Sequence, residues 1–206
     1  KRKYTKRKYY KKSTKADAAL KIARKNQKRL KATELKVLDT TLGASDIATT
    51  ATYLHLSDME QGTEAFERIG DNCTGRKLMY RFKCGYNVNG DQDVQARVFI
   101  FVWNDDTAPS TNALFDTSTP GTMGYFNTTN VGKFKILYSK IINLNDQRLT
   151  NQQQGYINLR DLVIKFSANL GSDYEIGSIW FGYYSDSTSA NLPEINGKFR
   201  LRYTDK

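Results

Sequence analysis

The chain has 206 residues, of which 39% are hydrophobic and 12% are aromatic, so it contains enough apolar sequence for one large or two small folded domains. Its formal net charge is +11 at pH 7, and no run of 18 apolar residues or apolar signal-peptide stretch accompanies the basic start. These features argue against a membrane-spanning or secreted protein, and we expect a protein that stays inside a cell until it is released.

The positive charge is concentrated in residues 1–31, which we call the basic arm. The arm contains 15 Lys or Arg and a single acid, Asp17, giving +14, whereas the other 175 residues contain 17 bases and 20 acids, giving −3. A block of like charge repels itself and is typical of a tail that binds a polyanion. A membrane fits less well than nucleic acid, because the arm has little apolar area to insert.

Lys and Arg neutralise phosphates without reading sequence, and tyrosines stack on unpaired bases. The sequence therefore predicts that the arm binds single-stranded nucleic acid through its 15 cations and three tyrosines. These candidate residues are Lys1, Arg2, Lys3, Tyr4, Lys6, Arg7, Lys8, Tyr9, Tyr10, Lys11, Lys12, Lys15, Lys21, Arg24, Lys25, Lys28, Arg29 and Lys31.

The first predicted element is a helix over about 14–31. Residues 1–12 show no periodicity, so we expect them to be disordered when unbound. Thr14 can cap the helix, and Asp17 lies three positions later, where it completes a capping box. The helix has a narrow apolar stripe and is otherwise basic, which continues the chemistry of the preceding residues.

Eight β-strands are predicted after residue 33, from β-branched and aromatic residues and from alternation with period two. In chain order the segments are 34–42, 47–57, 76–88, 94–104, 132–145, 156–167, 175–185 and 197–205. Six alternating positions, Leu78, Tyr80, Phe82, Cys84, Tyr86 and Val88, are expected on one buried face. With no repeated helix between the strands, the pattern favours an antiparallel sandwich or barrel.

Two regions depart from simple alternation. Residues 98–103 are apolar on both faces, as in a central strand or a strand at an interface. Residues 104–131 contain two of the three prolines and little periodicity, so we expect an exposed loop with a contact or surface role.

The chemistry-bearing residues do not form a catalytic pattern, and we predict no enzyme. Cys73 and Cys84 have no metal-binding spacing and are interpreted as buried, reduced thiols, and His55, the single histidine, as a structural side chain. The stretch GDNCTGRK has an Arg where a phosphate-binding loop needs Lys, so it is rejected as such a loop. Adjacent Asp105 and Asp106 are interpreted as turn-forming acids, with a calcium site or a carboxylate pair as the alternatives.

The body resembles a known family in the order of its motifs over about 54–206. The stretch LSDMEQGTEAFERIGDNCTGRKLMYRFKCGYNV is similar to the early part of small single-jelly-roll viral capsid proteins, the type found in satellite tobacco necrosis virus and circular single-stranded DNA viruses. Gln61, Gly62, Arg68, Gly70 and Asp71 match the family's turn before a long strand. The later stretches ARVFIFVWNDDTAPSTNALFD, GKFKILYSKIINLN, SIWFGYYSDS and GKFRLRYTDK resemble its subsequent strands.

The resemblance implies an all-β, eight-stranded antiparallel jelly roll over 32–206, preceded by the basic nucleic-acid-binding arm, 1–31. It implies a homo-oligomeric icosahedral shell of sixty copies around a single-stranded genome, with DNA favoured over RNA, located in the virion and assembled in the host nucleus. No cofactor and no membrane partner are implied. Some family members bind calcium, but no ligand set is assigned here, and Ser139 stands where an Asp is frequent.

Two other functions remain open from the residues alone. One is a cellular nucleic-acid-binding β-barrel with a basic tail. The other is a carbohydrate-binding or hydrolytic jelly roll, in which the 104–131 segment and its two acids would form a cleft.

Overall fold

The computed structural model describes residues 20, 22, 35–62, 67–116, 124–166 and 176–205. The chain divides into two units, 1–34 and 35–206. Within the first unit only Leu20 and Ile22 are described, and both are helical and exposed. The predicted disordered start and the rest of the predicted helix over 14–31 lie outside the described residues.

The second unit contains eight β-strands, one for each segment predicted from the sequence. They are β1 (Leu35–Asp46), β2 (Thr52–His55), β3 (Asn72–Gly85), β4 (Asp93–Trp103), β5 (Phe134–Asn145), β6 (Thr150–Lys165), β7 (Ser178–Ser185) and β8 (Glu194–Asp205). Both β3 and β6 begin several residues before the predicted segments, because their first residues are polar and carry little apolar signal.

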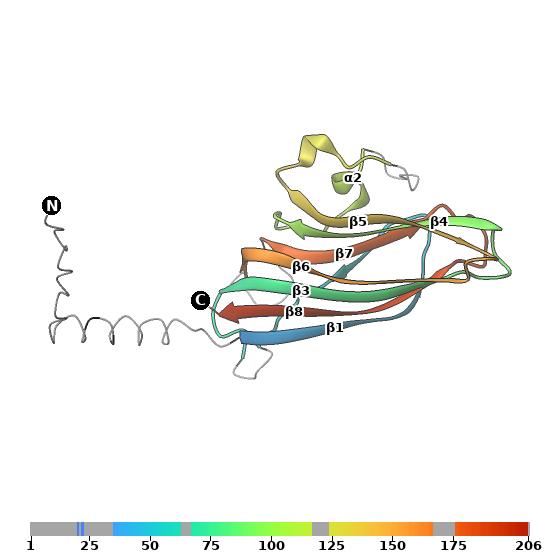
Figure 1. The fold of residues 1–206 in the computed structure, drawn as a ribbon. Helices are drawn as coiled ribbons and strands as arrows, with labels where there is room; N and C mark the ends of the chain where they lie inside the picture. Colours follow the sequence, from blue (N-terminus) through green and yellow to red (C-terminus); the bar gives the residue numbers. More distant parts are fainter. Residues whose placement is uncertain are drawn as a thin grey trace, which may run out of the picture. The chain divides into compact units, whose positions relative to one another are not determined.

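The strands form two four-stranded antiparallel sheets, in the orders β1-β8-β3-β6 and β2-β7-β4-β5. Figure 1 shows the two sheets facing each other, with β6, β3, β8 and β1 in one layer and β5, β4 and β7 in the other. Strands that are neighbours in the chain mostly lie in different sheets, so each sheet interleaves early and late strands. This is the double Greek-key arrangement of an eight-stranded jelly roll, and the fold prediction is confirmed.

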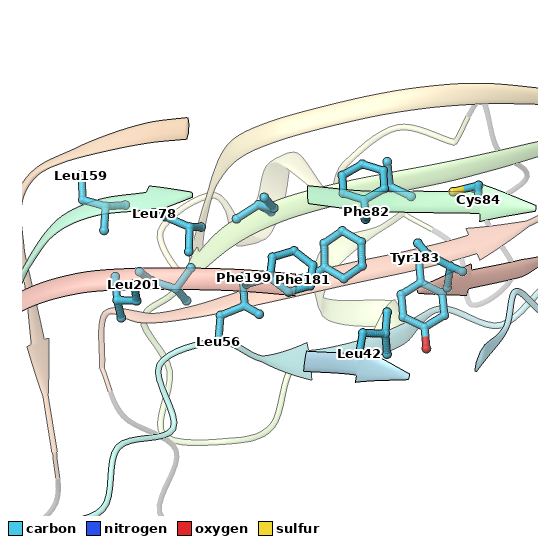
Figure 2. Close-up of a cluster of buried hydrophobic side chains, with 14 of the residues drawn as sticks. Leu42, Leu56, Leu78, Phe82, Cys84, Leu159, Phe181, Tyr183, Phe199 and Leu201 are labelled. Atoms are coloured by element: carbon cyan, nitrogen blue, oxygen red, sulfur yellow. The ribbon is translucent and has the colours of Figure 1, made fainter. Parts of the chain in front are cut away.

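The main core lies between the two sheets (Figure 2). Phe82 of β3 packs against Phe181 of β7, with ring centroids 5.4 Å apart, and Phe181 also contacts Phe199 of β8 at 4.8 Å. The predicted buried face of β3 is confirmed at Leu78, Phe82 and Cys84, and Tyr80 and Tyr86 are partly buried against the same core. The prediction that Val88 lies on this buried face is wrong, because Val88 follows the end of β3 and is 69% exposed.

A second apolar cluster covers the opposite side of the sheet β2-β7-β4-β5. Phe99, Phe101 and Trp103 of β4 belong to this cluster, together with Leu114 and Phe115 from the 104–131 segment. That segment contains a short helix, α2 (Thr111–Leu114), and a 3-10 helix, η1 (Thr128–Asn130), and α2 lies beside β4 and β5 in Figure 1.

The interpretation of 104–131 as an exposed loop is therefore wrong for this part of it, because Leu114 and Phe115 are almost fully buried. The same contacts explain the apolar character of both faces of β4. One face packs in the main core, and the other is covered by the chain's own segment. Among the described residues, no helix is long and apolar enough to cross a membrane.

Candidate functional site

All 18 predicted nucleic-acid-binding residues of the basic arm lie outside the described residues. The two described positions within the arm, Leu20 and Ile22, are not among those candidates. The arm therefore remains a prediction based on its charge and tyrosine content.

The predicted family turn is present as a compact hydrogen-bonded structure. Gln61 and Arg68 form an isolated parallel bridge, in which the Gly62 N–H donates to the Arg68 carbonyl at 3.0 Å and the Arg68 N–H donates to the Glu60 carbonyl at 2.9 Å. The Gln61 amide also donates to the Ile69 carbonyl at 3.4 Å. The five matched residues are thus brought together immediately before β3, and their assignment to a family motif stays a prediction.

Arg68 is the centre of this turn and is only 7% exposed. Its guanidinium donates to the Gly70 carbonyl at 2.7 Å, lies 3.7 Å from the Asp71 carboxylate and stacks 4.2 Å from the ring centroid of Phe166. The planar guanidinium suits this combination of stacking and hydrogen bonding. Because these contacts occupy Arg68 within the fold, its role here is structural.

A buried lysine at the start of β1 contacts both the turn around Arg68 and the end of β8. The ammonium of Lys36, 6% exposed, donates to the Glu67 carbonyl at 2.7 Å and pairs with the Asp205 carboxylate at 3.0 Å. Lys36 lies at the start of β1 and Asp205 at the end of β8. The Lys36 ammonium therefore joins three elements: β1, which contains it, the turn through the hydrogen bond to Glu67, and β8 through the ion pair with Asp205.

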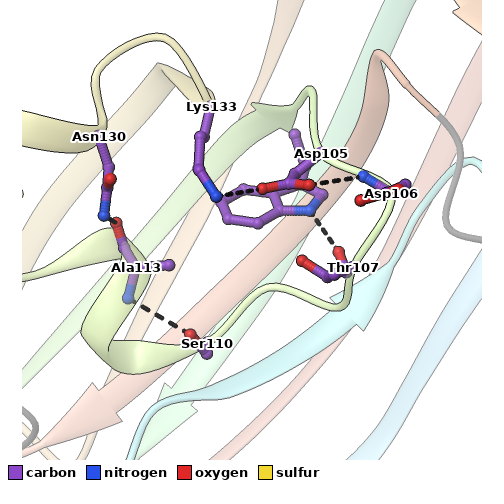
Figure 3. A network of polar contacts seen from close by, with 8 residues as sticks. Asp105, Asp106, Thr107, Ser110, Ala113, Asn130 and Lys133 are labelled. Atoms are coloured by element: carbon purple, nitrogen blue, oxygen red, sulfur yellow. Dashed lines mark hydrogen bonds and ion pairs between the residues drawn. The ribbon is translucent and has the colours of Figure 1, made fainter.

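Asp105 and Asp106 form a turn rather than an open carboxylate pair (Figure 3). The Asp105 carboxylate pairs with Lys133 at 2.5 Å and accepts the Asp106 N–H at 2.9 Å. The hydrogen bond from Lys133 is the main reason that the pKa of Asp105 is lowered. The turn-forming interpretation is confirmed. Within the described ranges, no group of three or more His, Cys, Asp or Glu side chains is arranged to hold a metal ion.

The histidine and the cysteines pack as structural side chains. His55 stacks on Trp180 with ring centroids 4.4 Å apart, and its Nε2 lies 3.0 Å from the Ser57 hydroxyl. Cys73 and Cys84 are free and fully buried, and burial raises the pKa of each thiol to about 12. A thiolate nucleophile is therefore strongly disfavoured at either position. Ser139, at the position where the family often has Asp, accepts a hydrogen bond from Arg97 at 3.3 Å.

The structure also brings together a set of cations that the sequence interpretation did not group. They are the outward-facing Lys and Arg side chains on the two central strands β3 and β8, and we call this surface the basic sheet face. Its cations are Lys77, Arg81, Lys83, Lys198, Arg200 and Arg202. The outward positions of β6 beside them are neutral: Gln152, Gln154, Tyr156 and Asn158.

Among the residues that the structure describes, Asp39 of β1 is the one acid within this surface. It holds Arg200 through two hydrogen bonds of 2.7 Å, and the bond from Arg200 is the main reason that the pKa of Asp39 is lowered. Asp46 of β1 and Glu194 of β8 are cross-strand neighbours, and they lie beyond one end of the basic sheet face. The alternation of bases in RKLMYRFK and KFRLR is visible in the sequence, but only the pairing of β3 with β8 shows that both series share one surface.

No protein-family model and no curated protein sequence matches this chain. Solved structures of viruses show loose similarity to it. A structure of desmodium yellow mottle tymovirus aligns at 12% identity and a TM-score of 0.36, over 82% of this chain and 87% of that one. A full particle of Israeli acute paralysis virus aligns at 11% identity and a TM-score of 0.35, over 84% and 68%.

A structure of deformed wing virus aligns at 13% identity and a TM-score of 0.30, over 82% of this chain and 44% of that one. All three TM-scores are below 0.5. The jelly-roll assignment therefore rests on the chain's own strand order and pairing.

Proposed function

We propose that this chain is a viral capsid protein that assembles into an icosahedral shell and packages a single-stranded genome through its basic arm. The main support for the proposal is that one chain contains both a segment with a net charge of +14 and a jelly-roll domain. Jelly rolls of this kind serve as capsid, lectin and cupin domains, and of these three a capsid shell needs a segment that neutralises a genome.

The surface of the jelly roll supports contacts between copies. Tyr125 is 83% exposed and Val131 is 71% exposed, and both lie in the segment that covers the sheet β2-β7-β4-β5. Val131 lines a hollow of about 490 Å³ together with Phe126, Phe134 and Ile136. Apolar side chains exposed beside an apolar hollow suit a protein–protein interface. Both faces of β4 are apolar, but neither is available for contacts between copies, because other parts of the same chain cover them.

The finer parts of the proposal follow the family resemblance. We propose sixty copies per shell and a single-stranded DNA genome, with assembly in the host nucleus and a final location in the virion. Sixty arms of +14 each supply about 840 positive charges, which neutralises a genome on the order of a thousand nucleotides. Phosphate and stacking contacts serve DNA and RNA alike, so the choice of DNA depends on the resemblance.

The test is to purify the full chain and the variant lacking residues 1–31, and to examine both by electron microscopy and size-exclusion chromatography. We expect the full chain to form uniform particles whose contents resist external nuclease and are degraded by DNase after the shell is opened. The deletion variant should keep the β-sheet signal in circular dichroism and lose the packaged nucleic acid. A stable monomer of 23.5 kDa at every salt concentration would contradict the capsid proposal, and filled particles of the deletion variant would contradict the role of the arm.

The carbohydrate-binding alternative depends on an acidic cleft formed by the 104–131 segment. In the structure Lys133 neutralises Asp105, and the hollow beside the segment is lined mainly by apolar and amide side chains. Glycan binding that persists without residues 1–31, in a protein that forms no particles, would favour that alternative. A small oligomer that binds nucleic acid would favour the cellular β-barrel.

A further inference from the structure

The charge pattern of the basic sheet face is unfavourable for the isolated domain. Lys77 lies directly opposite Arg202, and Arg81 lies directly opposite Lys198, in the antiparallel pairing of β3 with β8. Like charges directly opposite each other on one face of a sheet are destabilising. A surface selected for solubility alone intersperses the two signs. Two like-charged pairs on one face, separated along the strands by the pair Met79–Arg200, therefore indicate a surface that meets an anion.

The shape of this surface suits an extended chain. A groove of about 780 Å³ is lined by Arg81, Lys198, Arg200 and Tyr156, among others. A second hollow of about 460 Å³ is lined by Arg81 and Lys198 again, and also by Lys83. The two hollows adjoin each other at Arg81 and Lys198, and we call them together the track. From Met79 to Lys83 this track follows β3 for about 13 Å, at 3.3 Å per residue.

An exposed aromatic ring lies within the same track. Tyr156 is 61% exposed, and the Lys77 ammonium lies 3.9 Å from its ring centroid. A ring beside a row of cations is the combination that binds single-stranded nucleic acid, since the cations contact phosphates and the ring stacks on a base. A membrane surface fits less well, because Met79 and Tyr156 are the exposed large apolar side chains that this surface offers for insertion.

We propose that the basic sheet face is a second nucleic-acid contact surface, on which a single strand lies along β3 and β8 with phosphates at Arg81 and Lys198 and a base on Tyr156. This inference goes beyond the packaging role of the arm, because it assigns binding to the folded domain. It does not depend on shell formation. A bound strand is then held by the arm and also by the folded domain.

The first test measures binding of the full chain to a fluorescent single-stranded oligonucleotide at several salt concentrations. The variant Arg81→Gln/Lys198→Gln removes two charges from the basic sheet face. The control Lys135→Gln/Arg148→Gln removes two exposed charges elsewhere on the described domain. We expect the first variant to reduce the slope of log affinity against log salt by about 0.7 for each lost phosphate contact, and the control to leave it unchanged. Equal slopes for both variants would overturn the inference.

The second test uses the unmodified protein, so it does not depend on the folding of a variant. A 5-bromouracil-substituted oligonucleotide is crosslinked to the full chain by ultraviolet light, and the adducts are located by mass spectrometry. We expect an adduct at Tyr156, in addition to adducts in the arm. Adducts confined to Tyr4, Tyr9 and Tyr10 would overturn the inference and leave the packaging role of the arm intact.

The same oligonucleotide complex is challenged with phosphatidylserine vesicles and with a poly-glutamate peptide. We expect neither competitor to prevent the Tyr156 adduct at equal charge concentration, because neither supplies a base to stack on the ring. Loss of the adduct to either competitor would show that the surface selects a membrane or an acidic protein instead. Particle formation is scored separately by electron microscopy, so a failure of shell assembly is not confused with a failure of this surface to bind.

Discussion

Arg81 of β3 and Lys198 of β8 are direct cross-strand neighbours on an exposed sheet surface, two cations side by side. The orientation of the Gln152 amide that satisfies its hydrogen bonding places its oxygen 3.1 and 3.2 Å from two nitrogens of the Arg81 guanidinium. A neutral amide thus occupies the position where a carboxylate would neutralise the pair. The fold maintains a like-charged pair in the centre of a sheet, which has consequences for stability that can be measured.

Lys198→Glu should make the domain more stable and weaken nucleic-acid binding. The new carboxylate lies opposite Arg81, so repulsion becomes attraction, with a gain of about 0.2–1 kcal/mol. Urea unfolding measures the gain. The control is Lys135→Glu on β5, whose cross-strand partner is the neutral Val102, and no comparable gain is expected there. Identical changes in both variants would show that the effect comes from net charge and not from the opposed pair.

Phe115→Ala should destabilise the domain by about 3–5 kcal/mol, because a large buried ring is removed. The ring is 1% exposed and packs against Phe99 of β4 with centroids 5.6 Å apart. Tyr125→Ala, in the same segment but at an 83% exposed position, should change stability by no more than about 0.5 kcal/mol. Thermal or urea unfolding distinguishes the two. A mild effect at Phe115 would mean that the segment does not seal the outer side of the sheet.

Gly182→Ala should cost about 1–3 kcal/mol through overpacking. A Cβ atom at this position of β7 would overlap the ring of Phe99, which is fully buried on β4. Gly43→Ala on β1 is the matched control, because nothing lies within 4 Å of its added Cβ. The double variant Gly182→Ala/Phe99→Leu should recover part of the loss, since the smaller side chain leaves room. Additive losses in the double variant would argue against a clash with Phe99.

Alkaline pH should destabilise the domain. Burial raises the pKa of Cys73 and Cys84 to about 12, whereas an unfolded thiol ionises near 8.5. Above that value the unfolded state binds fewer protons than the folded state, so the free energy of unfolding falls as pH rises. Each thiol contributes on the order of 1.4 kcal/mol per pH unit once its unfolded form is ionised.

Urea unfolding at pH 8, 9 and 10 measures this slope, and Cys73→Ala/Cys84→Ala should reduce it. Buried phenols act in the same direction, since the pKa values of Tyr53 and Tyr138 are also raised to about 12 by burial. Iodoacetamide at pH 8 should label both thiols in urea and neither in the native protein. Rapid native labelling would contradict the burial of the two thiols on β3.

The strand content could be predicted from the sequence because alternation and β-branched residues are local signals. All eight strands were placed in this way, and β3 shows the clearest case at Leu78, Phe82 and Cys84. The error at Val88 is a boundary error, since the apolar alternation continues past the residue at which pairing with β6 and β8 ends.

The role of the 104–131 segment could not be predicted, because its buried residues are isolated in polar sequence. Leu114, Phe115 and Phe126 show no period, and their function as a cover depends on the rings of β4 that point away from the main core. The turn around Arg68 could be predicted from the family resemblance. Its buried stacking on Phe166, nearly a hundred positions away in the chain, could not.

The basic sheet face was missed for a similar reason. Residues 32–206 have a net charge of −3, and this sum hides the separation of positive and negative side chains within the domain. Lys77 and Arg202 are far apart in sequence and become neighbours only through the jelly-roll pairing. Net charge per segment is therefore a good guide to an unstructured tail and a poor guide to a sheet surface.

The position of β8 has a consequence for synthesis on the ribosome. β8 is the last of the eight strands in chain order, yet it lies between β1 and β3 in its sheet. Until Asp205 has been synthesised, β1 has no partner on that side and the cations of β3 have no neighbours on β8. A nascent chain therefore carries the arm long before it has the sheet surface, and the complete set of cations first exists once β8 has been synthesised and paired.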